Sequence, residues 1–182
     1  KEEDEPKLGD FDDTFTWSKE RLVQICEGLI KNNNKIMWSV RDRVNKTNVD
    51  ILKLMYKAGC RRIHYGIESG VQKVIDKMTK QIKIEDAITA VNNAKKVGMT
   101  VLTYFMFGNL DETYSDMQET AKFSKSLNSD YTEFSITIPY AGTEMYEEAL
   151  KNRIIDNDYW FDFAVNPTPN FKPPQLIENK VI

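Results

Sequence analysis

The chain has 182 residues, a formal net charge of -3 and 41% hydrophobic residues, which are ordinary proportions for a globular protein. They exclude a largely disordered chain and do not support nucleic-acid binding, which needs clustered lysine and arginine. No apolar run approaches the roughly 20 residues of a membrane helix, and no secretory signal stands at the start. Because the two cysteines, Cys26 and Cys60, are far apart, we expect free thiols, no metal site in this chain and a cytoplasmic location.

Strand-like segments alternate with segments of helical period along most of the chain. The sequence predicts strands at Leu8–Thr16, Lys35–Arg41, Arg61–Ile67, Met99–Phe107 and Tyr131–Pro139. Between them, apolar residues recur at the spacing of one helix face over residues 22–30, 51–58 and 84–94. Helix ends are marked too: Ser18 is a predicted N-cap, Thr113 and Asp116 form a predicted capping box, and Gly59 and Gly98 are predicted left-handed caps.

Strands that alternate with helices predict a parallel sheet, because parallel neighbours need a crossover connection. Five strands are too few for a closed eight-stranded barrel, so we expect an α/β fold with an open parallel sheet, either a partial TIM-like barrel or a doubly wound sheet. Residues 166–175 hold four of the six prolines and cannot form a helix or a central strand. We therefore divide the chain into a partial barrel, residues 1–152, and an extended aromatic and proline-rich C-terminal part, residues 153–182.

Polar side chains gather at the carboxyl ends of the predicted strands, where parallel α/β folds bind ligands. Carboxylates there accept hydrogen bonds from ammonium or ribose hydroxyl groups, and arginine pairs with a carboxylate in a fork. This rim therefore suits a zwitterionic, hydroxyl-rich ligand. Turn chemistry explains most single positions equally well. Glu68 is different, because between a buried strand and Gly70 an Asp or Asn would suit a turn better.

Four segments resemble the radical S-adenosylmethionine superfamily: FDDTFT, WSVRDRV, LMYKAGCRRIHYGIESG and IPYAGTEMYE. The nearest resemblance is to its cobalamin-dependent enzymes and the anaerobic magnesium-protoporphyrin ester cyclase, and it covers residues 11–150. It implies a partial (β/α)6 barrel in which the predicted strands are the second to the sixth. The family's C-x3-C-x2-C loop, which holds a 4Fe-4S cluster, is missing from this sequence. We therefore expect a fragment of a radical enzyme that is inactive alone.

The resemblance also implies contacts with S-adenosylmethionine, the cofactor that the cluster cleaves reductively to a 5′-deoxyadenosyl radical in the full-length enzymes. Asp12, Asp13 and Thr14 match the motif that meets the methionyl amino group. Glu68 and Ser69 match positions that contact the ribose or the methionine end of the cofactor. Further implied partners are an unknown small-molecule substrate, cobalamin held by an upstream domain, and a reductant protein such as flavodoxin or ferredoxin.

Other matched positions lie on the remaining strand ends. Arg43 matches a recurrent arginine suited to a carboxylate or a substrate, Phe107 and Gly108 would face the adenine, and Pro139 would help to close the far side. The loop Gly108–Glu112 reads GNLDE where the family usually has G-x-P-G-E, which changes the loop conformation.

Two functions from other classes fit the same residues. Asp12, Asp13 and Glu68 are candidates for the paired carboxylates of a barrel hydrolase, which would do general acid–base work. A non-catalytic module that binds a nucleoside is the second alternative. The single histidine, His64, lies within a predicted strand, and we expect it to be structural.

Overall fold

The computed structural model describes residues 7–8, 14–155, 158–173 and 175–176. Five strands lie in sequence order across one open sheet, and every neighbouring pair is parallel. They are β1 (Lys7–Leu8), β2 (Met37–Asp42), β3 (Cys60–Glu68), β4 (Thr100–Phe107) and β5 (Tyr131–Ile136). The predicted open parallel α/β sheet is therefore confirmed.

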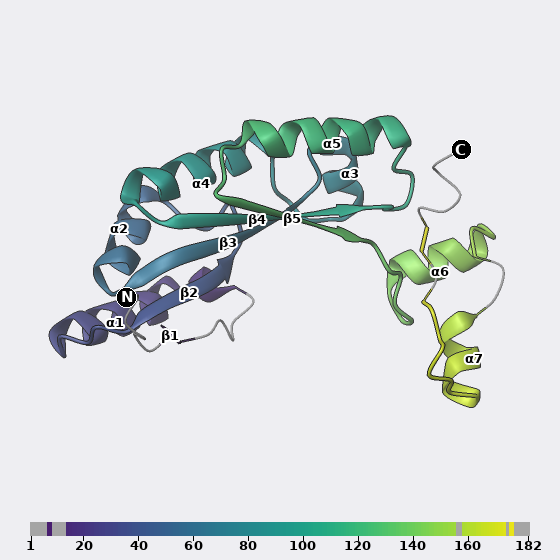
Figure 1. Cartoon of the computed structure of the whole chain (residues 1–182), viewed down its shortest axis with the longest axis horizontal. Coiled ribbons are helices and arrows are strands. Elements are labelled where there is room, and N and C mark those ends of the chain that lie inside the picture. Colours follow the sequence, from purple (N-terminus) through teal and green to yellow (C-terminus); the bar gives the residue numbers. More distant parts are fainter. Residues whose placement is uncertain (1–6, 9–13, 156–157, 174, 177–182) are drawn as a thin grey trace.

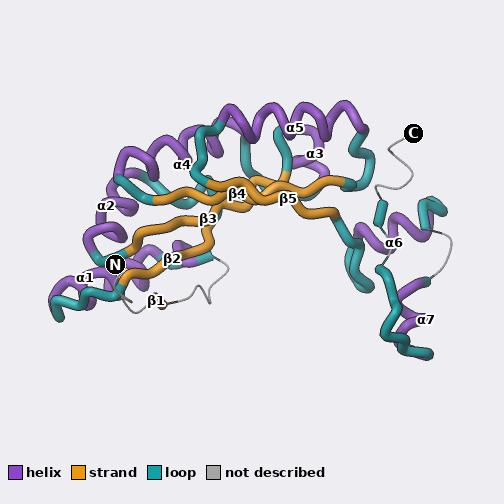
Figure 2. The backbone as a smooth tube through the Cα atoms, viewed as in Figure 1, coloured by secondary structure: helices purple, strands orange, loops and turns teal. Residues whose placement is uncertain are grey.

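Helices connect these strands and extend beyond the last one. They are α1 (Lys19–Lys31), α2 (Val49–Lys57), α3 (Gln72–Lys77), α4 (Ile84–Val97), α5 (Tyr114–Ser126), α6 (Glu144–Lys151) and α7 (Tyr159–Val165), with a short 3-10 helix η1 (Phe15–Trp17). Helices α2, α4 and α5 lie along one face of the sheet, whereas α6 and α7 lie beyond the end of β5 (Figures 1 and 2). Among the described residues, no helix combines the length and the apolarity that crossing a bilayer requires.

The main core lies between the sheet and its helices, and side-chain alternation on β3 defines it. Ile63, Tyr65 and Ile67 are fully buried. The alternate residues His64, Gly66 and Glu68 face the other side of the sheet and are only partly buried. Residues two apart share a face of a strand, so β3 buries one row of side chains under the helices and leaves the other row free to build a site.

The predicted helix ends agree with the structure. Ser18 Oγ accepts a hydrogen bond from the backbone N–H of Arg21 at 3.3 Å. Thr113 and Asp116 form the reciprocal capping box at the start of α5. Gly59 and Gly98 have φ values of 104° and 93°, which a residue with a Cβ rarely adopts. These local signals were readable because each depends on neighbours in the sequence.

The predicted first strand, Leu8–Thr16, is wrong at its carboxyl end. Residues Phe15–Trp17 form η1, and β1 covers only Lys7–Leu8 among the described residues. Tertiary contacts override the strand-like sequence, because the Asp42 carboxylate accepts hydrogen bonds from the Thr16 backbone N–H at 3.1 Å and from its hydroxyl at 2.6 Å. The chain is thus turned toward the end of β2.

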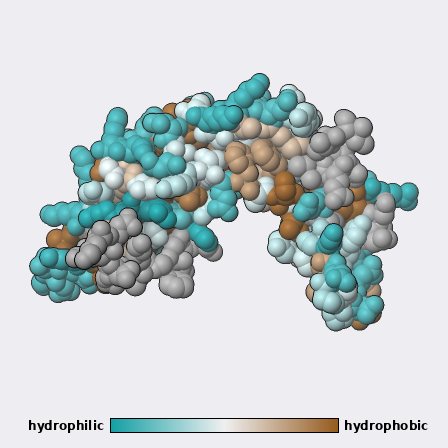
Figure 3. Space-filling model, viewed as in Figure 1, coloured by the Kyte–Doolittle hydropathy of each residue, from teal (hydrophilic) through white to brown (hydrophobic). Residues whose placement is uncertain are grey.

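A second, smaller core lies around α6. Tyr146 and Ala149 of α6 pack with Leu110, Ile155 and Leu176, so the segment after residue 152 shares this core with α6. Figure 3 shows hydrophilic residues along the outer side of α5 and hydrophobic ones where β5 leads into α6. Residues Tyr159–Val165 form α7, for which hydrophobic periodicity predicted no helix.

Candidate functional site

A cavity of about 560 Å³ opens on the face of the sheet opposite the main core, toward the carboxyl ends of β2 to β5. This volume is in the usual range of small-molecule sites, roughly 300–1,000 Å³. Its lining residues are Thr14, Arg41, Asp42, Arg43, His64, Gly66, Glu68, Lys80, Tyr104, Met106, Glu133 and Ser135.

Strand alternation supplies most of this lining. His64, Gly66 and Glu68 are every second residue of β3, and Tyr104 and Met106 stand in the same relation on β4. His64 Nδ1 lies 3.0 Å from the Tyr104 hydroxyl, so the two strands are also joined by a polar contact on this face. His64 therefore lies in the wall of the cavity.

Gly66 keeps the middle of the cavity open. A Cβ at this position would lie 2.7 Å from Glu68 Oε1 and 3.1 Å from Lys80 Nζ, so the ends of these two side chains would have to shift. A glycine within a strand often marks the close approach of another group. Here that group is an ion pair, so Gly66 makes room for charge inside the cavity.

Glu68 ends β3 in an unusual conformation. The β3–β4 register shifts between Gly66 and Glu68, and Glu68 has φ 72°. The left-handed region costs a non-glycine residue about 1–3 kcal/mol, and strained residues of this kind cluster at functional sites. A shift of this kind re-aims a side chain. In this position the Glu68 carboxylate forms an ion pair with Lys80, and the side chains are only 17% and 20% exposed.

The loop that carries Lys80 is fixed across the ends of β2 and β3. The Arg43 guanidinium donates a hydrogen bond to the backbone carbonyl of Lys80, and the Asn45 side-chain amide donates to that of Gln81 at 3.0 Å. Asp42 Oδ1 in turn accepts from the Arg43 backbone N–H at 2.8 Å. Arg43, Lys80 and Glu68 are thereby held together on one side of the cavity.

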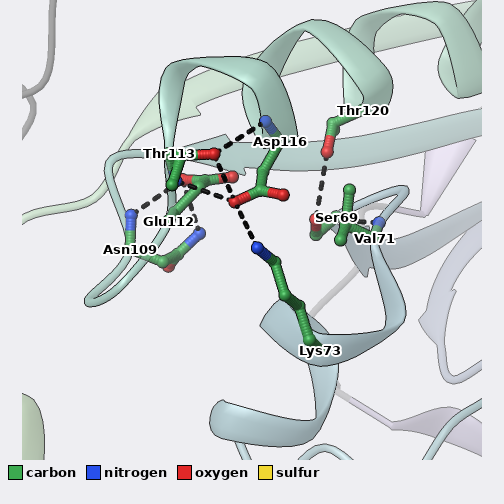
Figure 4. A network of polar contacts seen from close by, with 8 residues as sticks. All are labelled: Ser69, Val71, Lys73, Asn109, Glu112, Thr113, Asp116 and Thr120. Carbon is green, nitrogen blue, oxygen red and sulfur yellow. Dashed lines mark hydrogen bonds and ion pairs between the residues drawn. The ribbon is translucent and has the colours of Figure 1, made fainter.

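The other two residues of the Glu68-Ser69-Gly70 trio have structural contacts. Ser69 is fully buried, and its hydroxyl lies 3.0 Å from that of Thr120 on α5 and accepts from the Val71 backbone N–H at 3.1 Å (Figure 4). A Cβ on Gly70 would lie 2.6 Å from Phe123 Cβ. The three residues therefore have different roles. Glu68 faces the cavity, whereas Ser69 and Gly70 pack the end of β3 against α5.

The predicted site residues fall into three groups. Thr14, Arg43 and Glu68 line the cavity together. Ser69, Phe107, Gly108 and Pro139 are not among its lining residues. Asp12 and Asp13 lie outside the described residues.

Each of the residues that do not line the cavity has another contact. Phe107 stacks on Phe134 with ring centroids 5.0 Å apart, and the Gly108 backbone N–H donates to Glu112 Oε2 at 2.7 Å. The Pro139 carbonyl accepts from the Trp160 indole N–H at 2.8 Å. These contacts hold the strand ends in place around the cavity.

Some lining residues were missed by the sequence reasoning. Strand alternation could have placed Tyr104 with Met106, and Glu133 with Ser135, because each pair is spaced by two within a predicted strand. Lys80 gave no such signal. It stands on a loop after α3, and only the tertiary fold brings it to Glu68.

The charges of the cavity are mixed. Three basic residues, Arg41, Arg43 and Lys80, line it together with three acidic residues, Asp42, Glu68 and Glu133. Such a lining suits a zwitterion, because it offers partners for both an ammonium group and a carboxylate.

An iron–sulfur cluster does not fit the described residues. Among them, no group of three His, Cys, Asp or Glu side chains is placed to hold a metal ion. Cys26 and Cys60 are fully buried in the main core, and burial raises the pKa of the Cys26 thiol to about 11. Iron needs thiolates, so neither cysteine is suited to ligate it.

An open parallel sheet covered by helices on one face, with a cavity at the carboxyl ends of its strands, defines this molecule as a partial α/β barrel. The chain belongs to the Radical SAM superfamily, whose family model matches residues 10–124.

Two curated relatives extend the comparison. An uncharacterized methyltransferase of Pyrococcus horikoshii is 35% identical over 163 residues, which are 89% of this chain and 36% of that protein. The anaerobic magnesium-protoporphyrin IX monomethyl ester cyclase of Rubrivivax gelatinosus is 27% identical over 174 residues, or 94% of this chain and 31% of that protein. The chain thus spans about a third of the length of these relatives.

The fold is also similar to a solved structure, the radical S-adenosylmethionine methyltransferase TsrM from Kitasatospora setae with cobalamin and a 4Fe-4S cluster bound. The TM-score is 0.73 at 16% identity, and the match covers 80% of this chain and 28% of that one. At this identity the likeness concerns the fold, and it agrees with the partial barrel described above.

Proposed function

We propose that this chain is the S-adenosylmethionine-binding part of a methyltransferase-like radical enzyme. The observation that carries the proposal is the Glu68 carboxylate, which is held in a left-handed conformation inside a charged cavity at the strand ends. Family membership and the Pyrococcus horikoshii relative support this choice of cofactor. When bound in an enzyme of this kind, S-adenosylmethionine supplies a carbon–sulfur bond for reductive cleavage.

The residues present fit such a ligand. Glu68 would accept hydrogen bonds from its ammonium or ribose hydroxyl groups, and Arg43 and Lys80 would attract its carboxylate. Met106 offers an apolar contact in the same wall. Because Lys80 already pairs with Glu68, a zwitterionic ligand can replace this contact on both sides without leaving a charge unpaired.

We further propose that the cluster ligands, any cobalamin and the reductant partner belong to parts of the protein outside these 182 residues. The absence of a three-ligand group among the described residues supports this division. Anaerobic addition of iron and sulfide to the chain is then expected to give no 4Fe-4S absorbance. Stoichiometric cluster formation would contradict the proposal.

Calorimetry with S-adenosylmethionine tests the cofactor site directly. Glu68→Gln removes the charge, and we expect it to weaken binding at least about tenfold, since hydrogen bonds to a charged group contribute roughly 1.5–3 kcal/mol. Glu119→Gln changes an exposed carboxylate on α5 and serves as the matched control. Equal affinity in the two variants would exclude Glu68 from the site.

Adenosine and methionine, titrated separately, distinguish the remaining alternative. Binding of adenosine alone, with no contribution from the methionine end, would favour a nucleoside-binding module. Membership of the Radical SAM superfamily gives no support to the hydrolase alternative.

A further inference from the structure

Helix α7 has an apolar surface that the rest of the described chain does not bury. Its sequence is YWFDFAV, and none of its residues is buried. Phe161 and Val165 are 63% and 69% exposed. Six of its seven residues are apolar or aromatic, and exposed apolar patches commonly mark binding sites. The exposed apolar surface of α7 is therefore a candidate binding site.

A cavity of about 410 Å³ lies against this helix, and it shares no lining residue with the cavity around Glu68. It is lined by Tyr159, Phe161, Asp162, Phe163, Val165, Asn166, Thr168 and Phe171. Four of these residues, Tyr159, Phe161, Phe163 and Phe171, are aromatic.

The tail after α7 builds the second wall. The Phe171 backbone N–H donates to the Thr168 carbonyl at 3.1 Å, which turns the chain back toward the helix. Phe171 then stacks on Phe163, with ring centroids 4.4 Å apart, and contacts Trp160 at 5.2 Å. Trp160 is anchored in turn, because its indole N–H donates to the Pro139 carbonyl. The aromatic wall is thus fixed to the end of the sheet.

The charge of this cavity indicates what charge its ligand should have. Asp162 is the one charged side chain among its described lining residues. An anion would be repelled by Asp162, and a neutral apolar ligand would desolvate its carboxylate without replacing the lost water. A cation with apolar substituents meets both requirements, since it pairs with the carboxylate and is attracted to the aromatic faces.

We propose that the cavity between α7 and the tail binds a small organic ammonium ion, with Asp162 as its counter-ion and Phe161, Phe163 and Phe171 as its aromatic wall. The neighbouring Asp158 is already engaged, because its carboxylate accepts hydrogen bonds from the Phe161 backbone N–H and the Tyr146 hydroxyl. Asp162 is thus the carboxylate that lines the cavity. The site is separate from the cofactor site proposed above, and it goes beyond that function.

Choline and its neutral isostere 3,3-dimethylbutan-1-ol are the probes for this site, titrated into the protein by NMR at constant ionic strength. The two molecules have the same shape and differ in charge. We expect choline to bind about fivefold more tightly, which corresponds to a cation–π contribution at a partly exposed site. Asp162→Asn removes the counter-ion but not the ring faces, so it should weaken choline binding and leave binding of the alcohol unchanged. Glu147→Gln, an exposed carboxylate on α6, should leave it unchanged.

A second variant distinguishes a loss of binding from a loss of folding. Phe163→Leu keeps an apolar side chain but removes one ring face, so it should weaken choline binding while the circular dichroism spectrum stays the same. Equal binding of choline and the alcohol, or no binding of choline, would overturn the proposal. The proposal would also be overturned if a trimethyllysine peptide bound about tenfold more tightly than choline. That result would assign the site to a protein partner.

Discussion

At the scale of single residues, Glu68 shows a conflict between backbone and side chain. Its φ of 72° favours glycine or asparagine, and a glutamate there costs stability. The residues next to it give no structural reason for a carboxylate, since Ser69 and Gly70 make the contacts with α5. The side chain is therefore explained by what it does in the cavity, where it meets Lys80.

Glu112 is a buried carboxylate of the opposite kind, with a structural role. It is 2% exposed, and its Oε2 accepts a hydrogen bond from the Gly108 backbone N–H at 2.7 Å. The same oxygen accepts from the Asn109 backbone N–H at 2.9 Å (Figure 4). The loop has neither the proline nor the second glycine of the family pattern, so this carboxylate fixes its conformation.

We expect Glu112→Ala to lower the free energy of unfolding by about 3 kcal/mol, because it leaves two buried N–H groups without their charged acceptor. Urea unfolding measures the change. Glu119→Ala, on the exposed side of α5, should change it by less than about 0.5 kcal/mol. A loss below about 1 kcal/mol in Glu112→Ala would show that the loop does not depend on this carboxylate.

Asp116 makes stability depend on pH. Burial raises its pKa, but hydrogen bonds from Thr113 and Lys73 outweigh burial and leave the pKa below the ordinary 3.8. A carboxyl group whose pKa is lowered by folding stabilises the fold above its unfolded pKa, and this contribution is lost as the pH falls through the folded value. We expect the stability difference between wild type and Asp116→Asn to be largest near about pH 6 and to shrink below 3.8. A difference that stays constant would contradict this assignment.

What the sequence could predict at this scale depended on distance along the chain. The Thr113–Asp116 capping box and the Ser18 cap join residues three apart, so their spacing revealed them. Glu68 was singled out because its residue type did not suit a turn. Lys80 was missed, since its contact with Glu68 is made by a loop that follows another helix.

At the scale of elements, two glycines in different surroundings, Gly70 at the junction of β3 and α5 and Gly28 within α1, differ in the space around them. At Gly70, a Cβ would lie 2.6 Å from Phe123 Cβ and 2.9 Å from the Thr120 backbone, so the helix cannot approach β3 as closely. At Gly28, within α1, no atom lies within 4 Å of such a Cβ. A glycine-to-alanine substitution should therefore lower the stability of the protein at Gly70 and raise it at Gly28.

We expect Gly70→Ala to destabilise the protein by about 1–3 kcal/mol, because it forces α5 away from β3. Gly28→Ala should stabilise it by roughly 0.5–1 kcal/mol, since alanine loses less backbone entropy in a helix. Thermal unfolding of the two variants measures both effects. Stabilisation by both, or destabilisation by both, would mean that the approach of α5 is not the deciding factor.

The elements themselves were predictable where hydrophobic periodicity was clear. The strands β2 to β5 and the helices α1, α2 and α4 match their predicted segments within a few residues. The prediction failed where periodicity gave no guidance. Residues 15–17 have a strand-like sequence but are turned by Asp42. Helix α7 has one charged residue among six apolar or aromatic ones, so its sequence shows no amphipathic period.

At the scale of the whole molecule, two cores are joined at the end of β5. The main core lies under α2, α4 and α5, and the smaller one surrounds Tyr146 of α6. Lys77 of α3 links the two, since it forms an ion pair with Glu148 at 2.9 Å. Among the described residues, few ion pairs cross the junction, which favours separate opening of the α6–α7 part.

A substitution at Tyr146 can test whether the α6–α7 part opens separately from the rest of the molecule. It is 2% exposed, and its hydroxyl donates to Asp158 and accepts from the Trp160 backbone N–H, so it joins α6 to α7. Burial, with Asp158 nearby, raises the pKa of Tyr146 to about 12, and the hydroxyl therefore stays protonated as a donor at neutral pH.

We expect Tyr146→Phe to speed amide hydrogen exchange in α6 and α7, while exchange in α2, α4 and β3 stays as in the wild type. The reason is that the variant leaves the Asp158 carboxylate without its buried donor, which weakens the smaller core alone. Tyr131→Phe, whose side chain is 57% exposed on β5, should change neither region. Faster exchange throughout the sheet in Tyr146→Phe would mean that the two cores open as one cooperative unit, and the aromatic cavity of α7 would then share the stability of the barrel.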